Sequence, residues 1–447
     1  MQKRYSILVL AGLVAVAILM AQPSVLVQGV ALWTPDKPGS DNIEVVGHIP
    51  LGPRLSVADM DLEQELSRPY AYVARMVYGD KGDKGTDVID ISDPSKPKVV
   101  YQWRIENQDL HLGTGGMDVK HFKWAGRYYY VQSLQFGQGG PDSDLGAVVV
   151  DVTSLPDPTG VKEVARLRRP DAPGGFHNIF IYKHSNGRVL LITTTRAPHA
   201  GVYDLGMVVE GKLDEALIAQ IPVGDIAGGQ RGYHDFYVGY HPDTGEDRFY
   251  GGGTGGYYVY NISNIHHPEL LVTLTGISGV RSGHTFTPMP DGRYVIAETE
   301  YQFAPLRIFD LEPGLNGEVE NISRPISGWT ADWKNLTHNH EVRYPYVFVS
   351  GYLDGLQVFS MMDPYNPVTV AYYDTYVGPP NTRRYSMFNG AFGVDVRNAD
   401  GLIAVSDMTT GFWTFRMEGF QGWNGEDWGV PNVSSAQDWD SDLEDRP

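Results

Sequence analysis

The sequence contains no cysteine. This absence excludes disulfides, thiolate-bound metals, a cysteine nucleophile and lipid attachment at a bacterial lipobox. Any metal must therefore be bound by histidine, aspartate or glutamate. Positive charge is also scarce, because 35 lysines and arginines face 54 acidic residues and leave a net charge of −19. A phosphate backbone is bound by a basic surface, which this excess of negative charge disfavours, so we expect no nucleic-acid partner.

Long apolar runs are missing except at the N-terminus. There, two basic residues precede an apolar run that ends near Met20, which is the pattern of a signal peptide. Cleavage is expected after Ala21 or after Ala31, because each offers a small residue at the cut. The alternative is an uncleaved anchor, although the run is short for a membrane span. Residues 1–31 therefore predict an extracytoplasmic protein, which is periplasmic, secreted or on the cell surface, with membrane contact only through this segment.

Helical periodicity is also missing from the rest of the chain. Tyrosine, phenylalanine, tryptophan and valine are plentiful, and glycine and proline are frequent. This composition favours an all-β fold. The last segment, residues 419–447, is acidic and has little to bury, so we expect it to be disordered.

A short sequence motif recurs along the chain: an apolar strand, a turn of the form D-P-x-x-P, and another apolar strand. It is clearest at residues 90–100, returns at 261–271 and 362–370, and is looser at 151–158. Proline fixes φ and lacks a backbone donor, so it is excluded from the interior of a strand ladder. These segments therefore predict hairpin turns between strands.

Seven units can be placed around these turns. The seventh unit is short by one strand, whereas residues 42–50 resemble a terminal strand with no blade in front of it. We therefore predict a seven-bladed β-propeller over residues 42–418, closed by the N-terminal strand, because closure removes exposed strand edges. An open solenoid or two sandwiches are the alternatives. The units cover about 54–105, 115–169, 174–224, 231–277, 281–329, 336–377 and 389–418.

Four units begin their first strand with a histidine in a similar setting: His177, His234, His284 and His340. The first strand of a propeller blade lines the central channel, so equivalent histidines on successive blades should converge on the axis. Their imidazoles predict a site for a divalent transition metal, namely iron, copper, zinc or manganese. The alternative is a wet channel in which the histidines bond to water, to each other and to the backbone.

Charged residues accompany these histidines. Arg231 and Arg281 precede two of them at the same offset, and an arginine pair beside a metal would suit the carboxylate, sulfonate or phosphate of a small anionic substrate. Ordinary ion pairs in an acidic chain are the alternative. Glu298 and Glu300 lie one pleat apart and hence on one face of a strand, where they are candidate partners of the histidines or arginines. We take these four residues as the candidate catalytic residues.

Several segments resemble known propeller families. The motif at residues 90–100 resembles the LVIVD repeat, and much of residues 85–417 is similar to the surface-anchored propellers of the choice-of-anchor B family. The resemblance implies a secreted or surface-bound propeller and no settled activity; the chain departs from the pattern in lacking a recognisable C-terminal sorting anchor. The matching segments are residues 176–179, 234–235, 297–300, 339–342, 346–352, 354–359, 373–375, 390–393 and 406–411.

Two functions of different classes follow. The first is an exported metal-binding propeller that performs an oxidation or lyase-type reaction on a small anionic substrate. The second is a non-catalytic scaffold that binds a surface protein or glycan through its loops.

Overall fold

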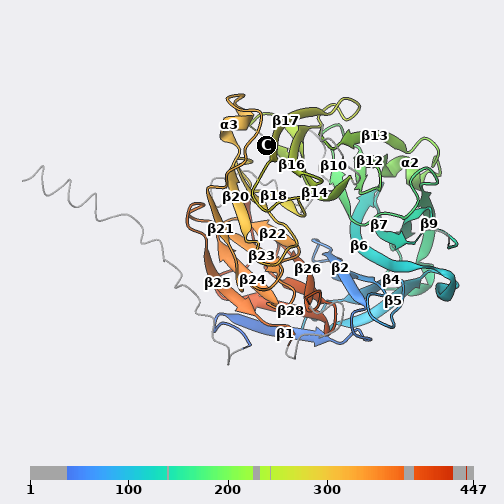
Figure 1. The fold of residues 1–447 in the computed structure, drawn as a ribbon. Helices are drawn as coiled ribbons and strands as arrows, with labels where there is room; N and C mark the ends of the chain where they lie inside the picture. Colours follow the sequence, from blue (N-terminus) through green and yellow to red (C-terminus); the bar gives the residue numbers. More distant parts are fainter. Residues whose placement is uncertain are drawn as a thin grey trace, which may run out of the picture. The chain divides into compact units, whose positions relative to one another are not determined.

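The structure is a computed structural model that describes residues 38–137, 140–224, 232–241, 243–376, 387–425 and 439. The signal peptide expected in residues 1–31 lies outside these residues, as does most of the acidic tail. Seven four-stranded antiparallel sheets form a ring, which confirms the seven-bladed β-propeller (Figure 1). None of the helices in the described ranges is long and apolar enough to span a membrane.

Each blade is built from strands that are consecutive in sequence, except the last. Blade 1 contains β2 (Val57–Leu62), β3 (Tyr70–Arg75), β4 (Gly85–Asp90) and β5 (Lys98–Arg104). Blade 2 contains β6 (Gly113–Trp124), β7 (Arg127–Phe136), β8 (Leu145–Asp151) and β9 (Lys162–Arg168). Blade 3 contains β10 (Ile179–Lys183), β11 (Val189–Thr193), β12 (His199–Asp204) and β13 (Leu217–Pro222). Blade 4 contains β14 (Tyr233–His241), β15 (Glu246–Gly253), β16 (Gly256–Asn261) and β17 (Glu269–Thr275).

The remaining blades follow the same plan. Blade 5 contains β18 (Phe286–Pro288), β19 (Tyr294–Ala297), β20 (Leu306–Asp310) and β21 (Ser327–Trp329). Blade 6 contains β22 (His340–Arg343), β23 (Tyr346–Ser350), β24 (Leu356–Ser360) and β25 (Val368–Tyr373). Blade 7 contains β26 (Ala391–Val396), β27 (Ile403–Asp407), β28 (Gly411–Met417) and β1 (Ile43–Ile49). The short helices are η1 (Gln108–Leu110), η2 (Pro158–Gly160), α2 (Leu205–Val209) and α3 (Glu312–Leu315).

The ring is closed by the N-terminal strand, as predicted. β1 pairs antiparallel with β28, from Ile43 opposite Met417 to Ile49 opposite Phe412. In Figure 1 the blue β1 therefore runs beside the red β28. The His48 ring stacks on Trp413 with 3.9 Å between ring centroids. This strand gives blade 7 the same four strands as its neighbours.

The D-P-x-x-P segments form the turns between the third and fourth strands of their blades. The turn after β4 is held by the Asp90 carboxylate, which accepts the backbone N–H of Ser92 at 2.8 Å. The turn after β16 uses the Asn261 side chain in the same way, accepting from Ser263 at 2.9 Å. Short side-chain acceptors replace the ladder hydrogen bonds that proline removes.

The hydrophobic core lies between adjacent blades. One cluster joins blades 3, 4 and 5 and includes the buried rings of Phe249, Tyr257 and Phe286. Burial of aromatic side chains of this size supplies much of the stability of a propeller, because neighbouring sheets pack face to face. The core extends past the predicted domain end at 418, since Phe420 and Trp423 are buried against blades 6 and 7.

Aspartates link the innermost strands around part of the channel. The Asp395 carboxylate of blade 7 accepts the backbone N–H of Leu62 in blade 1 at 2.8 Å. Asp61 accepts from the N–H of His121 at 2.6 Å, and Asp118 accepts from the N–H of Ile179 at 2.9 Å. Innermost strands are sheet edges with unpaired N–H groups, so these carboxylates satisfy donors that would otherwise lie in the channel without a partner.

Candidate metal centre

Four imidazoles from four successive blades lie in a row where the innermost strands begin. The His177 and His234 rings are 4.5 Å apart between centroids, and the His234 and His284 rings are 4.2 Å apart. The row ends at His338, whose ring is 4.9 Å from that of His284. The structure thus brings together three of the four predicted histidines, and the fourth member of the row is His338 in place of His340.

The strand register explains this exchange. The N–H of His284 donates to Glu298 O, and Glu298 N–H donates back to Thr285 O; His338, Ser350 and Asn339 repeat this pair of bonds in blade 6. His338 is therefore the equivalent of His284. The sequence pattern places the fourth histidine two residues too far along the chain, because spacing alone does not show where the ladder of β22 begins.

His340 occupies a different environment. It lies inside β22 opposite Val349, at the position that Phe286 holds in blade 5 and Phe236 in blade 4. Its side chain is about 3% exposed, and neither ring nitrogen has a hydrogen-bond partner within the described part of the chain. Burial, with a smaller contribution from the charge of His284, lowers the pKa of His340 to about 3.

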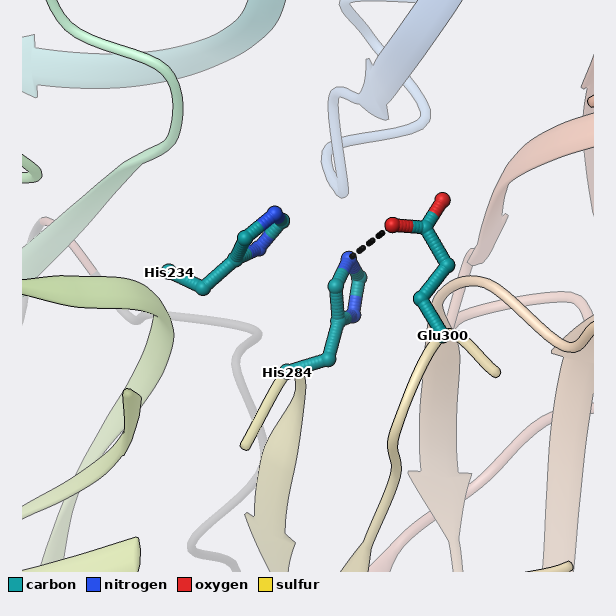
Figure 2. A group of neighbouring side chains, drawn as sticks. All are labelled: His234, His284 and Glu300. Carbon is teal, nitrogen blue, oxygen red and sulfur yellow. Dashed lines mark ion pairs between the residues drawn. The ribbon is translucent and has the colours of Figure 1, made fainter. Parts of the chain in front are cut away.

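Three of the clustered side chains offer a metal-binding geometry. One ligand atom from each of His234, His284 and Glu300 lies within 4.8 Å of the other two (Figure 2). Glu300 comes from the segment after β19, and its carboxylate is 3.8 Å from His284 Nε2. The dashed line in Figure 2 marks this ion pair. The Tyr352 hydroxyl donates to the other oxygen of Glu300 at 2.5 Å and fixes that carboxylate in place.

Hydrogen bonds orient the histidine rings. His177 Nδ1 donates to Gln135 Oε1 at 2.5 Å, and His338 Nδ1 donates to the backbone oxygen of Phe392 at 2.7 Å. A proton on Nδ1 leaves the lone pair on Nε2, which is the atom that a metal requires. Such acceptors behind the ring are the usual companions of metal-bound histidine.

His284 is held by both Thr285 and Glu298. Its Nδ1 is 2.9 Å from Thr285 Oγ1 and 2.7 Å from a Glu298 oxygen. Burial opposes the charged imidazolium, yet Glu298 and then Glu300 outweigh it and raise the pKa of His284 to about 9. Glu298 and Glu300 thus contact opposite nitrogens of one ring. This confirms the expectation that these glutamates contact the histidines.

The row of histidines is lopsided. In blades 2 and 7 the equivalent positions are Met117 and Phe392. The next residues, Asp118 and Gly393, each donate their N–H to a serine hydroxyl, as Asn339 does in blade 6. The Phe392 ring lies 3.9 Å from the His338 ring. One end of the row therefore borders apolar side chains, which keeps water away from that side.

Of the two predicted arginines, the structure describes only Arg281. Arg231 lies outside the described residues, and the side chain of Arg281 is exposed. Sequence reasoning also missed Gln135 and Tyr352, which support His177 and Glu300 from blades 2 and 6. No local pattern marks these two residues, because each meets its partner only through the packing of neighbouring blades.

A second feature of the channel is an acidic cavity of about 80 Å³, which is lined by residues of the innermost strands. The Lys120 ammonium lies 3.0 Å from Asp118 and 4.0 Å from Asp59 and partly neutralises them. Thr285 connects this cavity to the histidines, since its hydroxyl contacts both His284 Nδ1 at 2.9 Å and Asp235 at 3.1 Å. Burial raises the pKa of Asp118 to about 6. Lys120 thus serves as the resident cation of this cavity.

Comparison with known proteins adds no family. No family model matches the chain, and no curated protein matches its sequence. The fold and the cluster themselves define the class: a seven-bladed β-propeller with an off-centre histidine and glutamate cluster at one end of its channel.

Proposed function

We propose that this protein is an exported β-propeller that binds one divalent transition metal through His234, His284 and Glu300, with His177 and His338 beside them. The observation that carries the proposal is the approach of three ligand atoms to within 4.8 Å of one another. Two imidazoles and one carboxylate form the donor set of non-haem iron(II) oxygenases and of several catalytic zinc sites. Iron and zinc suit this set best, and copper and manganese accept the same donors.

The arrangement favours catalysis over a purely structural metal. Structural sites are closed, whereas catalytic sites keep a position for water or substrate. His177 and His234 are partly exposed, while His284 and His338 are buried, so the cluster is open on one side. A metal held there would act as a Lewis acid or oxygen activator in an oxidation or lyase-type reaction.

Export and family membership are part of the same proposal. The N-terminal pattern of residues 1–31 supports a cleaved signal, and the segments similar to LVIVD repeats support a secreted or surface-bound propeller. Mass spectrometry of the secreted protein would give the mature N-terminus. A chain that still begins at Met1 and stays with the membrane would instead support an uncleaved anchor.

Elemental analysis tests the metal. Protein purified without a histidine tag and reconstituted separately with iron(II), zinc, copper(II) and manganese(II) should retain about one equivalent of one of them. Glu300→Gln keeps the shape of the side chain and should lower the metal affinity at least about tenfold, as should His284→Ala. His267→Ala removes an exposed histidine outside the cluster and should leave the metal content unchanged.

Thermal unfolding gives a second readout. A ligand that binds only the folded state adds about 2.7 kcal/mol of stability at a hundredfold excess over its dissociation constant. The bound metal should therefore raise the unfolding temperature of the native chain and of His267→Ala, and raise that of Glu300→Gln clearly less, because a weaker site gains less stability at the same metal concentration. Absence of any metal after reconstitution, or equal retention by Glu300→Gln, would exclude the metal centre and leave the scaffold function.

A further inference from the structure

A second cavity opens beside the histidine row. It has a volume of about 370 Å³ and is lined by His177, His234, Gln135, Thr195, Tyr233 and Arg196, among others. This volume is in the range of small-molecule sites. Among the described residues no carboxylate lines it, although the chain carries 54 acidic residues against 35 basic ones. The cavity is therefore an electropositive spot on a strongly acidic protein.

Arg196 is the charged residue of this cavity, and it differs from the neighbouring arginines. Arg169, which follows β9, and Arg188, which precedes β11, pair with Asp171 and Asp204 at 2.7 and 2.8 Å. Arg196 has neither an ion pair nor a hydrogen bond within the described ranges. The Arg196 side chain is exposed, so its guanidinium is accessible to a ligand that enters the cavity from solvent.

The position of the Arg196 guanidinium depends on the backbone at Gly174. Gly174 has φ of +121°, and a Cβ there would lie 2.3 Å from Arg196 Nε and 2.8 Å from its Cζ. The Arg196 side chain therefore lies directly over Gly174, where any larger residue would displace it. Gly175 has φ of +75° and leads straight into Phe176 and His177, so one short segment positions both the arginine and the first imidazole.

We propose that this cavity binds the anionic end of the substrate, with Arg196 as its anchor, and that the rest of the molecule extends toward His177 and His234. The ligand class is a small molecule with a carboxylate, phosphate or sulfonate, because a guanidinium binds such groups through two parallel hydrogen bonds. The reaction at the far end rests on the proposed metal function, whereas the capture of the anion does not require the metal. Arg196 thus takes the role that the sequence suggested for Arg231 and Arg281.

Binding of three probes to the metal-free protein tests this assignment. Propionate, methylphosphonate and methanesulfonate are titrated, with the neutral amide propionamide as reference, by ligand-observed NMR at low ionic strength. At least one anion should bind more tightly than propionamide, and added salt should weaken it. The preferred anion identifies which of the three head groups the substrate carries.

Two arginine variants complete the test. Arg196→Gln should weaken anion binding about tenfold or more, since a charge-assisted hydrogen bond contributes roughly 1.5–3 kcal/mol. Arg281→Gln removes an exposed arginine that does not line the cavity and should have no effect. Equal binding by Arg196→Gln and the native chain, or no preference for anions over propionamide, would overturn the proposal.

The metal content of the same proteins separates the two proposals. Arg196→Gln should keep the metal of the native chain, because Arg196 is not among the clustered ligands. If the anion binds at Arg196 but the protein never retains metal, only the proposed metal function is excluded. If Arg196→Gln retains metal and binds the anion as tightly as the native chain does, only the proposed anion site is excluded.

Discussion

His340 occupies a position that phenylalanine holds in the two preceding blades. Phe236 and Phe286 fill it with apolar carbon, whereas His340 brings two ring nitrogens that have no hydrogen-bond partner within the described residues. An unsatisfied buried polar group costs about 1–3 kcal/mol. The low pKa of His340, about 3, reflects the same burial.

We therefore expect His340→Phe to stabilise the protein by about 1–2 kcal/mol in urea unfolding, because the new ring matches its neighbours and removes the unpaired nitrogens. Its metal content should equal that of the native chain. His284→Phe makes the same exchange at a proposed ligand and should lose metal affinity. A folded His340→Phe that loses its metal would show that His340 is a ligand and that the register argument fails.

Asp354 provides a residue whose charge state affects stability. Its side chain is half-buried, and loss of contact with water raises the pKa of the carboxyl to about 7, although Asn335 and the N–H of Asp332 donate to it at 2.5 and 3.1 Å. Between about pH 4 and pH 7 the folded chain holds a proton that the unfolded chain has released. Stability from this group is therefore complete below pH 4 and is lost as the pH rises through 7.

The free energy of unfolding should accordingly fall by up to about 1.4 kcal/mol per pH unit in this window because of Asp354. Asp354→Asn removes the titrating group, so its unfolding free energy should decline less steeply between pH 5 and pH 7 than that of the native chain. Urea unfolding at three pH values measures the two slopes. Parallel slopes would mean that Asp354 is already ionised at pH 5.

At the scale of the element, the segment that leads into β10 sets the position of the first histidine. Gly175 lies so close to blade 2 that a Cβ would be 1.9 Å from the backbone oxygen of Leu134, which also accepts the N–H of Phe176 at 3.0 Å. Its φ of +75° is a second reason for glycine at this position. The contact holds the start of β10 against blade 2 and so places His177 beside Gln135.

Gly175→Ala should cost about 1–3 kcal/mol, because the added methyl forces the two backbones apart. It should also weaken anion binding in the cavity, since Arg196 lies over the preceding glycine. Gly140→Ala is the control: its added Cβ would meet neighbours at ordinary distances of 3.4–3.6 Å. Guanidinium unfolding and NMR titration with the preferred anion measure the two effects. Equal behaviour of the two variants would show that the segment adapts without cost.

The sequence predicted elements better than it predicted the register inside them. Proline-containing turns mark blade boundaries locally, so the seven blades and the closing strand could be counted from composition and spacing. The choice between His338 and His340 depended on which residue begins the ladder of β22, and both are preceded by polar residues. Gln135, Tyr352 and Arg196 lie on other blades than the three candidate ligand residues. Their proximity to this group therefore depends on how the blades pack, which the sequence does not show.

At the scale of the whole molecule, β1 links the two ends of the ring. It completes blade 7 along β28, and it also touches blade 1: a Cβ on Gly47 would lie 2.2 Å from the backbone oxygen of Pro94 in the first D-P-x-x-P turn. The Thr414 hydroxyl donates to this same oxygen at 2.7 Å. One strand therefore covers the edge of the last blade and lies against the first.

A chain that begins at Leu51 should lose this closure. The edge of β28 would be left with unpaired backbone groups, which invite pairing with another chain, so we expect dimers or larger assemblies in light scattering and a lower unfolding temperature. A chain that begins at Pro38 keeps β1 and is the matched control. A synthetic peptide of residues 38–50, added to the shorter chain, should restore the monomer and raise its unfolding temperature, because each ladder hydrogen bond regained contributes about 1 kcal/mol. A shorter chain that stays monomeric and unfolds at the temperature of the control would show that six complete blades and a three-stranded seventh form a stable ring without β1.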